Sequence, residues 1–311
     1  MSKLLIGLDI GGTKSAAVLG DASGRVIERY ELPTSTPRET IARLCDFIRR
    51  QLGSRRACAC GISCGGPLSS RRGVILSPPN LPGWDEVPVV KWVSDSLGVP
   101  TVLENDANAA ALAEWHWGLD RKVDDLVYLT CGTGQGAGII LGGRLHRGSD
   151  DLAGEIGHIR LLPLGPVGYR KAGSVEGLTS GRGLAALARL RLQEPHPPSR
   201  LDSIPLSEID GKVVGNAAIE GDHFALSVVL ELGDYLGQAC AILIDLLNPQ
   251  RISLGTMAIQ LGQPLIEPVR AAARREALPR AFETCQIDVA ALGTRVQDLA
   301  ALAVADLAHR V

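Results

Sequence analysis

The sequence lacks a strong charge of either sign. Its 32 Lys and Arg residues nearly balance its 34 Asp and Glu residues, which leaves a formal net charge of −2 over 311 residues. Proteins that bind nucleic acid or an anionic membrane surface usually present a basic patch or a basic excess. We therefore expect neither nucleic acid nor membrane among the partners of this chain.

Long hydrophobic runs are also missing. The longest uncharged run, residues 126–143, is too rich in glycine for a membrane-spanning helix. The apolar stretch before Asp9 is too short for the hydrophobic region of a secretory signal peptide. These two absences predict a soluble, cytoplasmic protein.

The seven cysteines form no disulfide framework, because their number is odd and their spacing is irregular. Such usage fits a reducing compartment. Cys58, Cys60 and Cys64 lie close together, so a metal site is conceivable, but no His, Asp or fourth Cys stands at ligand spacing nearby. A Cys-x-Cys pair in an apolar stretch is more typical of small buried side chains, and we expect core packing there.

The chain alternates apolar runs typical of strands with amphipathic stretches typical of helices. In the first third the predicted strands are 4–8, 15–19, 25–31, 57–63 and 100–105, and the predicted helices are 36–52 and 87–98. The second half has a strand–turn–strand unit at 124–148, helices at 182–192 and 222–247, a strand within 251–256 and a final helix at 300–311. Two halves that each open with a glycine-rich hairpin predict a duplicated α/β fold with a cleft between its lobes.

The two hairpins carry the first candidate chemistry. In "GLDIGGTK" the order Thr13-Lys14 is the reverse of the P-loop order and no helix follows, and in "CGTGQGAG" the glycine spacing breaks the dinucleotide-binding fingerprint. Glycines at every second position would lie on one face of an extended segment and expose backbone amides to phosphate oxygens. Asp9 could hold Mg²⁺ there, directly or through water. The alternative is that both hairpins are only glycine-rich turns.

Asn105 and Asp106, in "VLENDANAAALAEWHWG", stand where a predicted strand ends and a helix begins. One interpretation is that Asp106 is only a helix N-cap. The other is that its carboxylate is a general base, which accepts the proton of a sugar hydroxyl as that hydroxyl attacks a γ-phosphorus. The position at a helix start predicts a lowered pKa for Asp106.

Residues 153–183 are polar, rich in glycine and too irregular for a helix. Glu155 and His158 have the Glu-x-x-His spacing of half a di-iron site, but the second copy and the additional helical glutamates are absent. We expect these two side chains and Glu176 to hydrogen-bond several hydroxyl groups of a ligand. The other histidines stand alone and are interpreted as surface or packing residues: His116, His146, His196, His223 and His309.

Six stretches, taken in order, resemble the ROK family of sugar kinases and repressors: "GLDIGGTK", "GGPLSSRRGVILSPPNLPGW", "ENDANAAALAE", "CGTGQGAGII", "AGEIGHI" and "LLNPQRISLG". Each is moderately specific alone; together they are highly specific and cover nearly the whole chain. The resemblance implies the actin-like, ribonuclease H-like ATPase fold, with two α/β lobes around a central cleft. We expect residues 1–112 to form the small N-terminal lobe and residues 113–296 the large one, with a helix at about 297–311 packing back on the small lobe.

The resemblance also assigns roles to single residues. Asp106 matches the catalytic base, and Asp9 matches the position that holds Mg²⁺, through water. The positions that hold the hydroxyls of the sugar are Gly66, Asn80, Asn105, Asp106, Glu155, His158 and Glu176. The ATP-binding positions, besides Asp9, are Gly11, Gly12, Thr13, Lys14, Gly132, Thr133, Gly134 and Gly255.

Two departures from the family pattern stand out. The family usually holds a structural zinc with the histidine that matches His158 and three cysteines, whose positions are Val167, Tyr169 and Ser174 in this chain. We therefore expect no structural zinc, and a loop held by packing of Val167 and Tyr169 instead. The second departure is Thr256, where the family usually has the second glycine of a Gly-Gly turn on the adenine side.

The resemblance implies an ATP-dependent kinase that phosphorylates the 6-hydroxyl of a hexose, most often glucose, in carbohydrate metabolism and glycolysis. N-acetylmannosamine, fructose, allose and glucosamine are alternative acceptors. A sugar-sensing repressor is a different class, but family repressors carry a helix-turn-helix before the first hairpin, and the first strand here begins at residue 3 or 4. A binding protein without catalysis is a third class, which the retention of Asp9, Asp106 and Glu176 argues against. A homodimer or higher homo-oligomer is expected from the family.

Overall fold

The computed structural model describes residues 3–309, and the chain divides into two compact units. The first unit contains the chain up to Lys122, the segment Leu145–Ala153 and the chain from Thr294 onward. The second unit contains Val123–Arg144 and Gly154–Gly293. The first unit thus continues past the predicted lobe boundary at residue 112, and it includes a segment that the sequence analysis assigned to the other lobe.

The first unit is built on a five-stranded sheet with the order β3-β2-β1-β4-β7. Its strands are β1 (Leu4–Ile10), β2 (Lys14–Asp21), β3 (Val26–Pro33), β4 (Ala57–Cys64) and β7 (Thr101–Asn105). The first three strands are antiparallel to one another, and β4 lies parallel to both β1 and β7. The five strands predicted for this part of the chain are confirmed, and the sheet is mixed.

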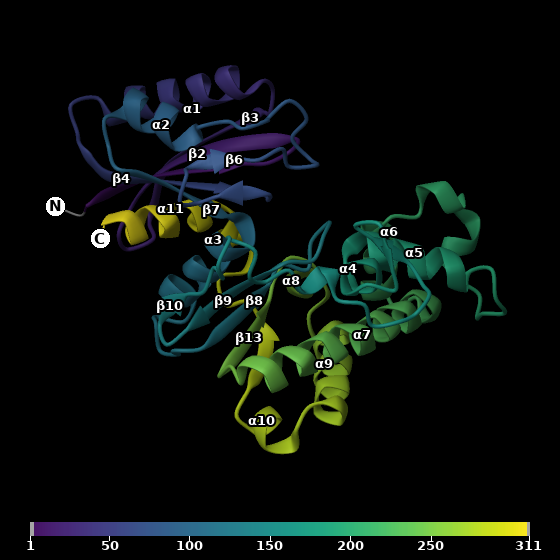
Figure 1. Cartoon of the computed structure of the whole chain (residues 1–311). Coiled ribbons are helices and arrows are strands. Elements are labelled where there is room, and N and C mark those ends of the chain that lie inside the picture. The colour runs from purple at the N-terminus through teal and green to yellow at the C-terminus, as the bar shows by residue number, and fades with distance from the viewer. Residues whose placement is uncertain (1–2, 310–311) are drawn as a thin grey trace. The chain divides into compact units, whose positions relative to one another are not determined.

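Helices cover both faces of this sheet (Figure 1). One face carries α1 (Pro37–Leu52) and α2 (Val89–Leu97), and the other carries α3 (Asp106–Ala113) and α11 (Val296–His309). The remaining elements of the unit are β5 (Leu68–Ser69), β6 (Val74–Ile75) and the π-helical turn η1 (Glu114–Gly118). The helix predicted at 300–311 therefore begins earlier, at Val296, while residues 310–311 of that prediction lie outside the described residues.

The amphipathic pattern of α1 is confirmed, because its apolar stripe is buried against the sheet. The cysteine prediction is also confirmed where it concerned packing: Cys60 and Cys64 are fully buried in the core, and Cys58 is half-buried. Burial raises the pKa of the Cys60 thiol well above its ordinary value. These two thiols behave as small core side chains.

The second unit contains a five-stranded sheet with the order β10-β9-β8-β13-β14. Its strands are β8 (Leu126–Leu129), β9 (Ala137–Leu141), β10 (Arg144–Leu145), β13 (Arg251–Leu254) and β14 (Gln286–Val289). Its longer helices are α5 (Gly181–Arg191), α6 (Gly211–Ile219), α7 (His223–Leu247) and α9 (Gln263–Glu276). The short elements are η2 (Ile156–His158), β11 (Val167–Gly168), β12 (Lys171–Ala172), α4 (Val175–Thr179), η3 (Arg200–Ser203), η4 (Leu206–Glu208), α8 (Met257–Leu261) and α10 (Pro279–Glu283). The short turn η5 (Gly293–Arg295) begins at the last residue of the second unit and continues into the first.

Helix α7 forms the centre of the second unit and lies beside α9 (Figure 1). Among the described residues it is the one helix long and apolar enough to cross a membrane, but 61% of its most apolar window is buried inside the protein. Gly233 and Gly237 let α9 approach closely, since a side chain at either position would collide with Pro268 or Ala272. These contacts identify α7 as a core helix of the unit.

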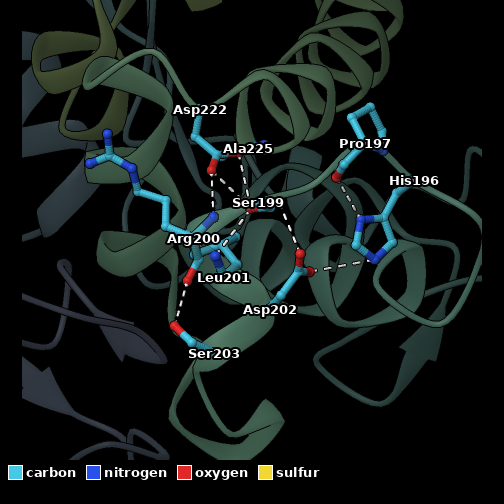
Figure 2. A network of polar contacts seen from close by, with 9 residues as sticks. All are labelled: His196, Pro197, Ser199, Arg200, Leu201, Asp202, Ser203, Asp222 and Ala225. Carbon is cyan, nitrogen blue, oxygen red and sulfur yellow. Dashed lines mark hydrogen bonds and ion pairs between the residues drawn. The ribbon is translucent and has the colours of Figure 1, made fainter.

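The proline-rich connection after α5 is tied down by a polar network, shown in Figure 2. The Ser199 hydroxyl and the Arg200 backbone N–H donate to the carboxylate of Asp222, which also accepts from Ala225 as the N-cap of α7. Burial alone would raise the pKa of Asp222, but these hydrogen bonds outweigh burial and the pKa lies below the ordinary value. The Nε2 of His196 lies 3.6 Å from the Asp202 carboxylate.

Candidate active site

The β1–β2 turn forms the first candidate ligand surface. The Gly11 N–H donates to the Lys14 carbonyl at 3.1 Å, which closes the turn. Gly12 packs directly on the backbone of Asn80, and a Cβ at Gly12 would come within 2.9 Å of the Asn80 Cβ. The structure thus brings together Gly12 and Asn80, which the sequence analysis assigned to different ligands. Thr13 is exposed at the tip of the turn.

Asp9 lies near the end of β1, directly opposite Ser63 on the parallel strand β4. Burial raises the pKa of Asp9 to about 6, although the Ser63 hydroxyl lowers it by donating to the carboxylate; the nearby carboxylate of Asp106 raises it further. Two carboxylates that repel each other in a shielded position form a donor set that favours a cation. The sequence analysis did not identify Ser63, although Ser63 holds the register position on β4 that faces Asp9 on β1.

Lys14 begins β2, and its ammonium lies 2.7 Å from the Glu31 carboxylate on β3. Lys14, and after it Arg29, lower the pKa of Glu31 to about 2. The ammonium that the sequence analysis assigned to the phosphates is therefore paired along the sheet in this structure.

Asn105 and Asp106 share the start of α3. The N-cap is Asn105, whose Oδ1 accepts from the Ala107 N–H at 2.9 Å, so Asp106 is the first helical residue and not the cap. The Asp106 Oδ1 accepts from the same N–H at 2.8 Å. Asp106 is exposed, with Gly65 nearby, and Gly66 lies next to the Asn105 amide.

The prediction of a lowered pKa for Asp106 is wrong. Loss of solvent around the carboxyl group raises its pKa, and the hydrogen bonds from the Ala107 and Asp106 N–H groups offset that rise only in part. The residue as a whole keeps accessible surface, and burial around its carboxyl group is the largest cause of the raised pKa. A carboxylate with a raised pKa is a stronger base than an ordinary helix-cap aspartate.

The turn between β8 and β9 is the second candidate surface, and it is a bend and not an extended segment. Gly132 and Gly134 lie in the bend, whereas Gly136 directly precedes β9, so the prediction that the glycines line one extended face is wrong. The Gly132 N–H donates to the Gly134 carbonyl at 3.1 Å, and Cys131 has a φ of +45°. Thr133 is exposed at the tip.

Glu176 lies against this bend. Its Oε2 accepts from the Gln135 N–H at 3.2 Å, and a Cβ at Gly134 would come within 2.8 Å of the same oxygen. Glu176 belongs to the short helix α4, so the prediction that its whole segment is too irregular for a helix is wrong at this point. The structure therefore places Glu176, a predicted sugar-binding residue, against the turn that was predicted to bind the phosphates.

The segment before α4 brings His158 and Tyr169 together, with ring centroids 5.6 Å apart in an edge arrangement. Glu155 precedes the turn η2, and both Glu155 and His158 are exposed. Val167 is 65% exposed and Tyr169 is 62% exposed, so the prediction that their packing holds the loop is wrong for Val167 and holds for Tyr169 only in its contact with His158.

Ser174 is fully buried, and its hydrogen bonds hold the loop instead. Its hydroxyl accepts from the Gly177 N–H at 3.2 Å as the N-cap of α4, and it donates to the Gly168 carbonyl at 3.3 Å. The β11–β12 hairpin completes the loop. The donor set of His158, Val167, Tyr169 and Ser174 contains no thiolate and does not fit a structural zinc.

Gly255 and Thr256 form the turn after β13. Gly255 is required because any side chain there would collide with the ring of Tyr128. Thr256 has a φ of +30°, in the region that favours glycine, and it is exposed. The departure from the Gly-Gly pattern therefore leaves a strained β-branched residue in the turn.

The comparisons with known proteins concern the chain as a whole. The sequence profile of the ROK family matches residues 5–310. Glucokinase of Halalkalibacterium halodurans is 31% identical over 93% of this chain and 90% of its own length, and N-acetylmannosamine kinase of Salmonella heidelberg is 34% identical over 88% and 89%.

A solved structure of similar fold is the ROK family glucokinase of Streptomyces griseus in complex with glucose and AMPPNP. It has a TM-score of 0.80 and 31% identity, over 99% of this chain and 100% of that one. The fold is therefore the actin-like ATPase fold. With the family profile matched from the first strand to the last helix, this chain belongs to the ROK family.

Proposed function

We propose that this chain is an ATP-dependent hexose kinase, which transfers the γ-phosphoryl group of ATP to the 6-hydroxyl of a hexose. The observation that carries the proposal is the Asn105–Asp106 pair: a carboxylate of raised pKa stands beside an amide whose Nδ2 makes no hydrogen bond to the described residues. The substrate class is supported by the relatives, which include glucokinases and N-acetylmannosamine kinases.

In this proposal Asp106 accepts the proton of the 6-hydroxyl while the hydroxyl oxygen attacks the γ-phosphorus. The new oxygen–phosphorus bond forms as the bond from the γ-phosphorus to the bridging oxygen of ADP breaks. Asn105 would use its free amide donor on a sugar hydroxyl, because its Oδ1 is already occupied by the helix cap. Gly66, Asn80, Glu155, His158 and Glu176 are proposed as further sugar contacts.

The turn amides of both hairpins are proposed to contact the phosphates of ATP. Mg²⁺ would supply charge neutralisation of the phosphate oxygens. Magnesium in phosphoryl-transfer sites keeps several waters and uses one or two carboxylates. The raised pKa of Asp9 fits a carboxylate that pairs with magnesium, since a cation would favour the charged form of Asp9. Asp9 is therefore the proposed protein contact, through water.

Glucose is the first acceptor that we propose, and N-acetylmannosamine is the second. We further propose that the enzyme is cytoplasmic, forms a homodimer or higher homo-oligomer, and needs no structural zinc. Size-exclusion chromatography with light scattering tests the oligomer. Metal analysis after dialysis against EDTA tests the zinc, with unchanged thermal unfolding as the expected result.

The kinase is tested by sugar-dependent ADP release with Mg·ATP over a panel of hexoses and N-acetylhexosamines. One sugar should stimulate release, and Asp106→Asn should lower the rate by about 100-fold or more, as the loss of a general base does. The matched control is Asp95→Asn, which removes an exposed carboxylate paired with Lys91 on α2 and should leave the rate unchanged. Sugar binding without stimulated release would favour a sugar-sensing protein instead.

A further inference from the structure

Glu104, at the end of β7, is a buried carboxylate directly before the Asn105–Asp106 pair. Only 1% of its surface is exposed. Its Oε1 accepts from the Asn105 backbone N–H at 3.0 Å and from the Asn108 side chain at 2.9 Å. One carboxylate oxygen therefore fixes the peptide that leads into the candidate base and the first turn of α3.

The other oxygen of Glu104 accepts from the Nε of Arg147 at 2.7 Å. No other cation is paired with Glu104 among the described residues. The Arg147 side chain is 33% exposed, whereas Glu104 is enclosed. Since a buried charge without a partner is strongly unfavourable, the geometry of Glu104 depends on this guanidinium.

Arg147 comes from the strap, by which we mean the segment Leu145–Ala153. The strap belongs to the first unit, although the chain on either side of it belongs to the second. Asp151 holds it a second time, because its carboxylate accepts from the N–H and the hydroxyl of Ser70 at 2.9 and 2.6 Å. The strap then runs directly into Gly154 and Glu155.

We propose that Arg147 is a positioning residue for the phosphoryl transfer: it neutralises Glu104 and so holds the turn that presents Asn105 and Asp106. The inference rests on the proposed kinase function. It goes beyond that function by giving the strap a role in catalysis without contact to substrate. A purely structural anchor would affect folding, whereas a positioning residue also controls the rate of the folded protein.

The two partners should respond unequally to mutation. In Arg147→Met the buried Glu104 carboxylate loses the one cation paired with it among the described residues, so it must reorient and release the Asn105 peptide. We expect kcat to fall about 10- to 100-fold, as small misplacements of catalytic groups do, with a raised KM for sugar and an unchanged KM for ATP. In Glu104→Gln the amide oxygen still accepts from Asn105 and Asn108, and the half-exposed Arg147 turns to water. This variant should lose less than about 3-fold, because the charge that it leaves unpaired, Arg147, reaches solvent, where losing an ion pair costs little.

The decisive variant is the double mutant Glu104→Gln/Arg147→Met. Because no unpaired charge is left at position 104, it should be at least about 10-fold faster than Arg147→Met alone, which is a large non-additive effect. Arg147→Lys should restore part of the rate. Circular dichroism and thermal unfolding confirm that each protein used for kinetics is folded.

The matched control cycle uses Arg72 and Glu86, an exposed ion pair of 2.9 Å in the same unit. Arg72→Met and Glu86→Gln should each leave kcat unchanged and show no coupling. Additive losses at Glu104 and Arg147, or a folded Arg147→Met with full kcat, would overturn the proposal. If the wild-type protein shows no sugar-dependent ADP release, the kinase function fails by itself. In that case urea unfolding tests the charge pairing: the double mutant Glu104→Gln/Arg147→Met must still be more stable than Arg147→Met alone.

Discussion

Replacing Gly61 by Ala should displace α11 from the sheet of the first unit. Gly61 on β4 lies beside Gly7 on β1 in the parallel register, and α11 crosses this surface of paired glycines. A Cβ at Gly61 would come within 3.0 Å of the Ala301 carbonyl oxygen and the Ala305 amide nitrogen. Real Cβ atoms do not approach so closely, and backbone atoms of a helix cannot turn aside as a long side chain can.

The size of the effect follows from that contact. Overpacking a core costs about 1–3 kcal/mol, and the upper end applies because the obstructing atoms are backbone. For a domain of this size, a loss of about 3 kcal/mol lowers the melting temperature by about 6–12 °C. Asp9 and Ser63 each stand two residues beyond this glycine pair, so ADP release should fall as well.

Tryptophan fluorescence is the assay, because Trp84, Trp92, Trp115 and Trp117 all belong to the first unit. The control is Gly215→Ala in α6, where a Cβ would meet Leu261 at an ordinary 3.5 Å. That change should leave the tryptophan transition where it is. A Gly61→Ala protein that melts within about 2 °C of the wild type would refute the packing argument, since less than about 1 kcal/mol would then have been lost.

Three further substitutions test local features. Asp222→Asn should destabilise the protein by about 1 kcal/mol at pH 7, as the loss of cap hydrogen bonds does. Because the folded pKa of Asp222 is lowered, this stabilisation is present above the unfolded pKa of about 4 and is lost as pH falls through the folded pKa, so urea unfolding of the two proteins should converge below pH 4. Thr256→Gly should raise stability by about 1 kcal/mol by relieving a positive φ, and an unchanged melting temperature would contradict the strain. Ser174→Ala removes the N-cap of α4, so it should destabilise the protein by about 1 kcal/mol and raise the KM for sugar through Glu176. A KM equal to that of the wild type would show that this loop does not affect sugar binding.

Strong periodicity made the main elements predictable from sequence. The stripe of α1, the long apolar pattern of α7 and the glycine-rich hairpins all lie where the sequence analysis expected them. Helix α9 was not predicted, because Pro268 stands inside it; in the structure that proline packs on Gly233 of α7. Strand β14 was not predicted either, because it is only four residues long. It forms by pairing with β13, and such a pairing cannot be inferred from a short apolar run.

The candidate site was predictable as residue types but not as contacts. Asp9, Asn105 and Asp106 were found because their polar side chains interrupt apolar runs. The raised pKa of Asp106 was missed, since a helix start predicts stabilisation of charge and only the folded structure shows how much solvent the carboxyl group loses. Lys14 was assigned to phosphate on its position in the turn, and the register of β2 on β3 instead sets it beside Glu31.

The sequence around Glu104 indicates a buried ion pair but does not identify the partner of Glu104. A glutamate in the apolar strand "TVLEN" must either face solvent or meet a cation, and its neighbours in sequence are not basic. Its partner Arg147 lies 43 positions away, in a strap that the sequence gives to the other lobe. A buried acid beside candidate chemistry therefore predicts that a positioning cation exists, while the topology of the folded chain decides which cation it is.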